Sequence, residues 1–115
     1  MEKNVKISIL CDLYGKLLTE KQFEFINDYY NNDLSLSEIA ENNDITRQAV
    51  RDIIKKGEKK LFEYEEKLGF MKKTIMHEEQ VAKILSELNK IEKKSTDKEV
   101  AKVLQDVRKK INCLI

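Results

Sequence analysis

Three long polar side chains stand at the start of one predicted helix, and they are Arg47, Gln48 and Arg51. An arginine can bond a guanine base bidentately and a glutamine can do the same with adenine, so this trio could read bases in a DNA major groove. Lys55 and Lys56 follow along the same helix, where lysines suit contact with phosphate. These five residues predict a nucleic-acid contact surface, with Arg47, Gln48 and Arg51 directed toward the bases.

Two hydroxyl side chains accompany this surface at the starts of predicted helices. Thr46 directly precedes Arg47, and Ser37 lies in the first turn of the preceding helix. The N-terminus of a helix presents backbone N–H groups that can bond a phosphate. We therefore expect Ser37 and Thr46 to hold phosphates together with Lys55 and Lys56.

The charge of this segment differs from that of the whole chain. Residues 47–60 carry six basic and two acidic residues, a local charge of +4, whereas the chain of 115 residues totals only +1. Nineteen of the 22 basic residues are lysines, so the lysines of this segment are equally compatible with a solvated helix face. Arginines are scarcer, and the pair Arg47 and Arg51, one turn apart, favours nucleic acid as the partner.

Other chemistries have little support in the sequence. His77 is the only histidine, and one histidine without matched ligands does not make a metal site. Three glycines leave no phosphate-binding loop or nucleophile elbow. We expect no enzyme activity, no cofactor, no metal and no small-molecule substrate. Cys11 and Cys113 are interpreted as two small buried hydrophobes, because their spacing is not that of a zinc site or a disulfide framework.

Several aromatic residues could stack on bases if the ligand were RNA. They are Tyr29, Tyr30, Phe62, Tyr64 and Phe70. Core packing is the favoured interpretation of this set, since aromatic residues recur here at helical intervals where a small core needs bulk.

The elements that position the polar surface form a helix-turn-helix pattern between residues 35 and 60. Ser35 and Glu38 make a capping box that opens a short helix, a polar turn follows, and Thr46 caps a helix that continues to residue 68 and ends at Gly69. Ala40 is small where the helices must cross. The apolar residues expected to fix the crossing angle are Ile39, Ile45, Val50 and Ile53.

Two more helices are predicted before this unit. One covers residues 3–14 and ends at Gly15 as a left-handed C′ residue. Its apolar face is expected to comprise Val5, Ile9, Leu10, Leu13 and Leu17. The next helix begins with a capping box of Thr19 and Gln22 and runs to about residue 31.

The last third of the chain predicts a helical hairpin. One helix covers about residues 73–93, and a second follows a capping box of Thr96 and Glu99. Apolar stripes on both helices resemble the a/d seam of a coiled coil. We expect a helix-turn-helix domain over residues 1–69 and a hairpin over residues 70–115. The hairpin either packs within the chain or forms a homodimer through the C-terminal helices, and both alternatives stay open.

Composition supports an all-α fold. Proline is absent, charged residues make up 37% of the chain, and hydrophobic residues still reach 41%. Sandwiches and barrels need frequent Gly/Pro-rich turns, whereas this composition can bury a helical core. No apolar run approaches the length of a membrane span and no secretory signal is visible, so we expect a cytoplasmic protein.

Residues 35–40 (Ser-Leu-Ser-Glu-Ile-Ala) and 45–50 (Ile-Thr-Arg-Gln-Ala-Val) resemble region 4 of bacterial sigma factors. More closely, the chain resembles the YlxM family of small proteins, which also fits residues 17–22 and 64–68. The resemblance implies a DNA-binding helix-turn-helix fold without a winged element. It also implies a link to the signal recognition particle pathway.

The sequence departs from the family pattern at two places. Asn43 and Asp44 occupy the turn where the motif usually has an apolar residue and a glycine, although aspartate tolerates the left-handed conformation better than most residues. Arg51 stands where relatives often have an aromatic residue. Our hypothesis is a non-catalytic, DNA-binding regulatory protein, and the alternative is a module that binds RNA, a protein or the signal recognition particle.

Overall fold

The computed structural model describes residues 1–114, which are helical apart from short connections. The elements are α1 (Lys3–Tyr14), a 3₁₀ turn η1 (Gly15–Leu17), α2 (Glu20–Tyr30), α3 (Leu36–Asn43), α4 (Arg47–Leu68), α5 (Phe70–Lys94) and α6 (Lys98–Cys113). No strand occurs within these 114 residues, so the predicted all-α class is confirmed. The chain divides into two compact units, Met1–Met71 and the residues from Lys72 onward.

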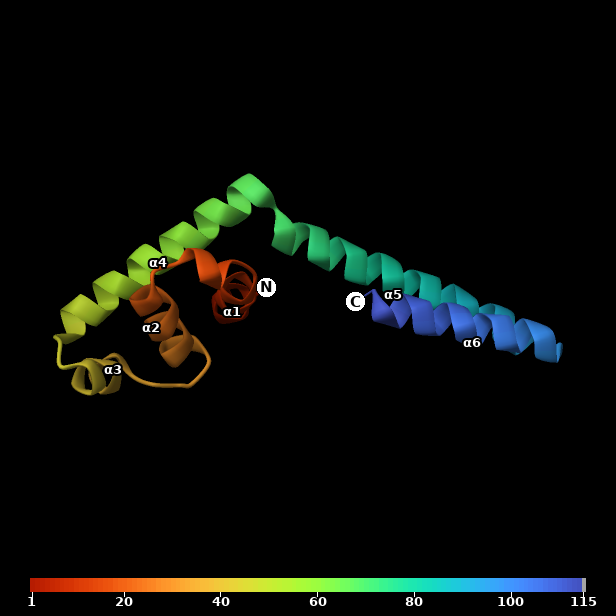
Figure 1. Ribbon diagram of the computed structural model, residues 1–115, viewed down its shortest axis with the longest axis horizontal. Helices are drawn as coiled ribbons and strands as arrows, with labels where there is room; N and C mark the ends of the chain where they lie inside the picture. The colour runs from red at the N-terminus through yellow and green to blue at the C-terminus, as the bar shows by residue number, and fades with distance from the viewer. Residues whose placement is uncertain (115) are drawn as a thin grey trace. The chain divides into compact units, whose positions relative to one another are not determined.

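In the first unit, α1, α2 and α3 all pack against the long helix α4 (Figure 1). The helices begin where side chains cap them. Thr19 with Gln22 and Ser35 with Glu38 both form complete capping boxes, as predicted. Thr46 caps α4 through a hydrogen bond from the Ala49 N–H, also as predicted.

The core of this unit is built from fully buried side chains of all four helices. They are Ile7, Leu10, Tyr14, Phe25, Ile26, Ile39, Val50 and Leu61. Of the face predicted for α1, Leu10 is buried and Ile9 is half-buried, whereas the prediction is wrong for Val5, Leu13 and Leu17, which are exposed. Cys11 is buried as expected, but Cys113 is exposed and the expectation for it is wrong.

Two glycines allow close approach between elements. Gly57 lies within α4, where a Cβ atom would meet Cδ1 of Ile26 at 2.6 Å, so its absence lets α2 pack tightly on α4. A Cβ on Gly15 would meet the Phe23 ring at 2.6 Å. Gly15 has right-handed backbone angles (φ −56°, ψ −33°), so its prediction as a left-handed C′ residue is wrong.

The end of α4 is fixed by a glycine and by a buried tyrosine. Gly69 adopts φ 65° and ends α4 as predicted. The Phe70 N–H donates to the Tyr14 hydroxyl at 3.1 Å, and the Met71 N–H donates to Glu65 Oε1 at 2.9 Å. These acceptors satisfy backbone donors in the first turn of α5, which therefore begins at Phe70 and not at the predicted residue 73.

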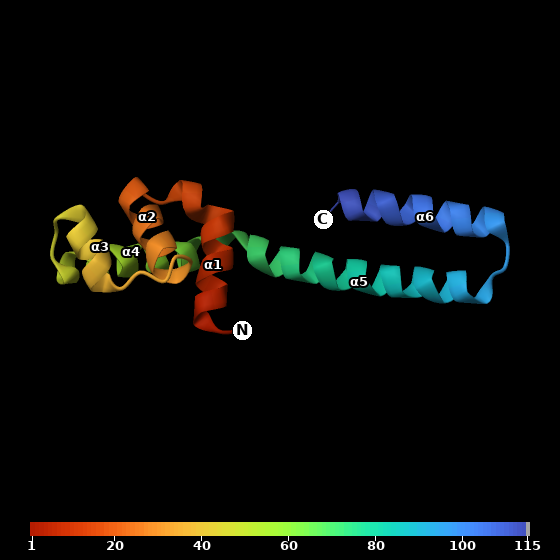
Figure 2. The same cartoon turned by 90° about the horizontal axis from the view of Figure 1, so that it is seen from below.

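The second unit is an antiparallel hairpin of α5 and α6 (Figure 2). Leu104 is buried between the helices, and Arg108 on α6 donates to Asn89 and forms an ion pair with Glu92 on α5. The cap of α6 is Asp97, whose side chain accepts from the Glu99 N–H, so the predicted capping box of Thr96 and Glu99 is wrong. No helix among the described residues is long and apolar enough to span a membrane.

Candidate nucleic-acid interface

The turn between α3 and α4 is closed by a left-handed residue. Asp44 adopts φ 54° and ψ 45°, as the sequence allows, and Asn43 donates its side-chain amide to the Ile39 carbonyl at 2.8 Å. The Ile45 N–H then bonds back to the Ala40 carbonyl at 3.1 Å. This bonding ends α3 in the manner of a Schellman motif and directs the chain into the Thr46 cap.

The crossing of α3 and α4 is fixed by four buried side chains, which are Ile39, Ala40, Val50 and Ile54. Two residues predicted for this role are less buried than these four. Ile45 is 38% exposed, and Ile53 is only half-buried, because its neighbour Ile54 faces the core instead. The helix-turn-helix geometry therefore rests on a partly different apolar set from the one that the sequence indicated.

The exposed face of α4 carries the side chains expected to contact nucleic acid. All of the proposed contact residues are exposed to solvent: Ser37, Thr46, Arg47, Gln48, Arg51, Lys55 and Lys56. Arg47, Gln48 and Arg51 together line a shallow hollow with Leu36 from the start of α3. The structure thus brings the three proposed base-contacting residues to one place, whereas the proposed phosphate contacts Ser37, Thr46, Lys55 and Lys56 do not line this hollow.

Local contacts leave most of these groups available. Among residues 1–114, no ion pair involves Arg47, Arg51, Lys55 or Lys56. Gln48 donates to Asp52 Oδ1 at 3.1 Å, so a base contact by Gln48 would exchange this bond. The helix cap at Thr46 occupies an acceptor site of its oxygen, and its O–H can still donate.

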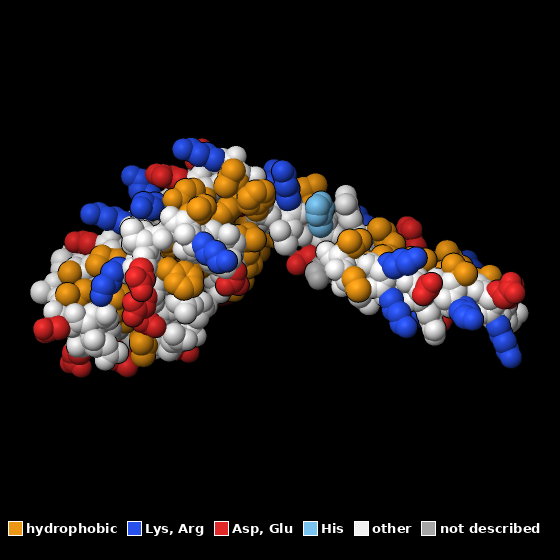
Figure 3. Space-filling model, in the orientation of Figure 1, with side chains coloured by type: hydrophobic (Ala, Val, Ile, Leu, Met, Phe, Trp, Pro, Cys, Tyr) orange, Lys and Arg blue, Asp and Glu red, His pale blue; other side chains and the backbone are white. Residues whose placement is uncertain are grey.

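The electrostatic character of this unit is uneven. Through Met71 the sequence has 11 basic and 14 acidic residues, so the unit as a whole is negative. Lys and Arg side chains follow the outer edge along α4, whereas Asp and Glu gather around α3 (Figure 3). An anionic polymer would therefore be attracted to one side of the unit and repelled elsewhere.

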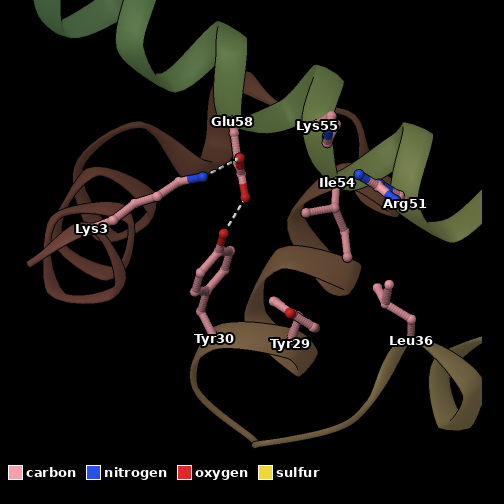
Figure 4. Close-up of a pocket in the computed structure, with 8 residues that line it drawn as sticks. All are labelled: Lys3, Tyr29, Tyr30, Leu36, Arg51, Ile54, Lys55 and Glu58. Carbon is pink, nitrogen blue, oxygen red and sulfur yellow. Dashed lines mark hydrogen bonds and ion pairs between the residues drawn. The ribbon is translucent and has the colours of Figure 1, made fainter.

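A second hollow adjoins the first and is shown in Figure 4. It encloses about 260 Å³ and shares Leu36 and Arg51 with the first hollow. We call it the tyrosine hollow, and its lining residues are Lys3, Tyr29, Tyr30, Leu36, Arg51, Ile54, Lys55 and Glu58. Sequence reasoning missed Lys3 and Glu58 here, since no spacing along the chain connects the start of α1 with the middle of α4.

Polar contacts fix one wall of the tyrosine hollow. The Tyr30 hydroxyl donates to Glu58 Oε1, and Glu58 Oε2 forms an ion pair with Lys3 at 3.5 Å. Burial raises the pKa of Tyr30 above its ordinary value, and the hydrogen bond to the Glu58 carboxylate and its charge raise it further. Tyr30 is therefore a neutral donor at physiological pH.

The interpretation of the aromatic residues has a mixed outcome. Tyr29 and Phe70 are exposed and Phe62 and Tyr64 are half-buried, so the core interpretation of the aromatic set is wrong for Tyr29 and Phe70. Within the described part of the chain, no group of three or more His, Cys, Asp or Glu side chains could hold a metal ion.

A family model described as "UPF0122: Putative helix-turn-helix protein, YlxM / p13 like" matches residues 1–107. The chain belongs to this family. This family assignment agrees with the helix-turn-helix geometry of α3 and α4 and confirms the resemblance found in the sequence.

Curated members of the UPF0122 family align along most of the chain. A UPF0122 protein of Acetivibrio thermocellus is 41% identical over 115 residues, covering all of this chain and 98% of the relative. One from Clostridium perfringens is 44% identical over 106 residues, 92% of this chain and 93% of the relative. Another, from Fusobacterium nucleatum, is 50% identical over 80 residues, 68% of this chain and 78% of the relative.

Proposed function

We propose that this UPF0122 protein is a non-catalytic nucleic-acid-binding protein that acts on DNA in the cytoplasm as a regulator. The observation that carries the proposal is the hollow that Arg47, Gln48 and Arg51 line at the exposed start of α4. These residues directly follow the turn of the helix-turn-helix. In such a motif the N-terminal part of the second helix contacts base edges in the major groove.

The proposed contacts divide into two kinds. Arg47, Gln48 and Arg51 contact bases, for which their donor geometry is suited. Phosphates are held by Ser37, Thr46, Lys55 and Lys56, which carry no sequence information but fix the register of the protein on the duplex. Membership of a helix-turn-helix family supports contact of this segment with nucleic acid, as does the local charge of +4 over residues 47–60.

The test is the double variant Arg47→Ala/Arg51→Ala, assayed against genomic DNA fragments and RNA at moderate salt. Loss of two arginine contacts is expected to weaken DNA binding at least tenfold. The matched control is Lys16→Ala/Lys67→Ala, which removes two exposed cations of the same unit outside both hollows. Unchanged affinity of the arginine variant would overturn the assignment.

A salt titration separates phosphate from base contacts. The logarithm of the association constant is expected to fall linearly with that of the salt concentration, and Lys55→Gln or Lys56→Gln should each reduce the slope by about 1. Indifference of wild-type binding to salt would contradict phosphate contacts altogether.

A second candidate function is an interaction module for a protein or ribonucleoprotein. It is favoured by the second unit, where Ile84, Ile91 and Val103 are exposed, the last by 61%. The resemblance of the sequence to the YlxM family suggests components of the signal recognition particle as partners. Recovery of the particle's GTPase or RNA with the full chain, together with no DNA binding, would favour this candidate over the first.

The same exposed apolar residues support a homodimer through α5 and α6. A dimer would hold two helix-turn-helix units at a fixed spacing, as doubled DNA sites require. Light scattering is expected to give twice the chain mass of 13.5 kDa, and Val103→Glu is expected to return it to one chain mass.

A further inference from the structure

The tyrosine hollow continues the surface of α4 that the proposed DNA contact uses. Arg51 and Leu36 line both hollows, so a nucleic acid lying on Arg47 and Gln48 would pass its mouth. The hollow is lined by side chains of α1, α2, α3 and α4 (Figure 4). Because four elements form it, its shape depends on the folded unit and not on any one helix.

Tyr29 provides an exposed aromatic ring that packs against the ring of Tyr30. Its side chain is 39% exposed, and its ring meets that of Tyr30 edge to face at 5.0 Å and 87°. Tyr30 is held by its bond to Glu58, which in turn pairs with Lys3. Because this exposed ring is already held in place, little conformational entropy is lost when a flat group stacks on it.

The cations at this hollow suit a phosphate. The lining contains three cationic side chains and one carboxylate, so its net charge is positive. The cations are Lys3, Arg51 and Lys55, and the carboxylate is that of Glu58. In the part of the chain that the structure describes, neither Arg51 nor Lys55 has an ion-pair partner, whereas Lys3 is engaged by Glu58. Lys55 is therefore the group that would take a phosphate, and Arg51 remains available for its proposed base contact.

The wall of the hollow carries a hydrogen-bond acceptor, the Glu58 carboxylate, to which a phosphate has no donor to offer. The Glu58 side chain is only 12% exposed, and each of its oxygens retains acceptor capacity beyond its bonds to Tyr30 and Lys3. Exocyclic amino groups of cytosine, adenine and guanine are donors that fit such an acceptor. Repulsion by this carboxylate disfavours a free phosphate or an acidic peptide inside the hollow.

We propose that the tyrosine hollow receives one unpaired nucleobase of a nucleic acid bound along α4, with the base stacked on Tyr29 and the adjoining phosphate held by Lys55. This inference rests on the proposed function, because α4 must first bind the nucleic acid. Its consequence is a preference for strands in which one base is already unpaired, since extruding a base from a duplex costs free energy.

The probes are two short hairpins with stems of about two helical turns, one fully paired and one with a single bulged 2-aminopurine. Each is prepared as DNA and as RNA, so that the two sources of an unpaired base are distinguished. Binding is measured at low salt with the full chain, and 2-aminopurine fluorescence reports stacking of the bulged base directly.

Three variants of α2 isolate the aromatic surface. Tyr29→Leu removes the ring but keeps apolar bulk, and Tyr29→Phe keeps the ring. Phe23→Leu is the matched control, because Phe23 lies on the same helix, is exposed to a similar extent at 42%, and is outside the hollow. Circular dichroism confirms that each variant is folded before binding is compared.

Wild type is expected to bind the bulged hairpin about tenfold more tightly than the paired one, in DNA, in RNA or in both. Tyr29→Leu should abolish this ratio and the fluorescence change, whereas Tyr29→Phe and Phe23→Leu should retain both. A structural effect of Tyr29→Leu would weaken both hairpins equally and leave the ratio unchanged, which would overturn the inference.

A separate variant keeps this inference distinct from the proposed function. Arg47→Ala should weaken binding of both hairpins without changing their ratio. If wild type bound both hairpins equally and Arg47→Ala weakened that binding, the inference about the tyrosine hollow would be wrong and the proposed function would stand. No binding of any hairpin would overturn both.

Discussion

The hydroxyl of Tyr14 donates a hydrogen bond of 2.7 Å to Oε1 of Glu65, 51 residues further along the chain. The same carboxylate oxygen accepts the Met71 N–H, and the tyrosine oxygen accepts the Phe70 N–H. One buried tyrosine therefore joins α1 to the end of α4 and to the first turn of α5. These hydrogen bonds fix the junction after Gly69 within the first unit.

Tyr14→Phe is expected to lower the free energy of unfolding by about 1–3 kcal/mol, because it removes the hydrogen bond to the partly buried Glu65 carboxylate and the hydroxyl that accepts the Phe70 N–H. Urea denaturation followed by circular dichroism measures the change. Tyr64→Phe is the control, since its hydroxyl donates only to the exposed Leu17 carbonyl at 3.3 Å, and its cost should be about 0.5 kcal/mol. Equal costs for the two variants would contradict a special role for Tyr14.

Stability is expected to fall at alkaline pH. Burial raises the pKa of Cys11, Tyr14 and Tyr30 above their ordinary values of 9.0 and 10.0, with nearby carboxylates adding to each shift. The folded state keeps these groups neutral where the unfolded chain ionises them. Their contribution is therefore complete well below pH 9 and is lost progressively as the pH rises above 9 and 10 toward the raised pKa values of the folded state.

Tyr30→Phe isolates one of these groups. Above pH 10 the variant should lose stability less steeply than wild type, because it lacks the one proton that the unfolded chain releases at Tyr30. The two slopes should differ by up to about 1.4 kcal/mol per pH unit. Urea unfolding at a series of pH values between 8 and 11 measures both slopes. Parallel slopes in the two proteins would show that Tyr30 ionises as easily in the folded state as in the unfolded chain.

The left-handed backbone at Asp44 gives a graded series of substitutions. Asp44→Gly is expected to stabilise the chain by about 0.5–1 kcal/mol, since glycine has no Cβ to strain at φ 54°, and Asp44→Ala to destabilise it by about 1 kcal/mol. Asp44→Asn should lie between these. Thermal unfolding orders the four proteins, and an alanine variant as stable as wild type would contradict strain at this turn.

Local signals in the sequence predicted the frame of the helix-turn-helix well. The capping boxes at Thr19 and Ser35 depend on a few neighbouring residues and form as predicted, and Asp44 takes the left-handed conformation that its residue type allows. The exposed positions of Arg47, Gln48 and Arg51 were equally predictable, because long polar side chains leave the core to apolar neighbours.

Tertiary contacts decided what the sequence left ambiguous. Apolar residues occur all around α1, so its periodicity could not distinguish the buried Ile7 and Tyr14 from the exposed Val5. Ile53 and Ile54 are adjacent and identical, and only tertiary packing buries the second more deeply than the first. The tyrosine hollow was beyond sequence reasoning because Lys3, Tyr29 and Glu58 meet only through folding.

The contact between Gly57 and Ile26 predicts a coupled pair of substitutions. Gly57→Ala alone should destabilise the chain by about 1 kcal/mol, because overpacking against the buried Ile26 side chain outweighs the gain in helix propensity. Ile26→Val removes the Cδ1 atom that a new Cβ would meet at 2.6 Å and costs about 1 kcal/mol by itself.

The double variant should therefore be about 1 kcal/mol more stable than the sum of the two single changes predicts. Urea unfolding of all four proteins completes the cycle. Gly57→Ala with Leu10→Val is the control, since Leu10 is equally buried but contributes none of the three atoms that a Cβ at Gly57 would meet first, and this pair should be additive. Additivity of Gly57→Ala with Ile26→Val would mean that α2 and α4 separate to admit the new methyl group, and that Gly57 does not set their distance.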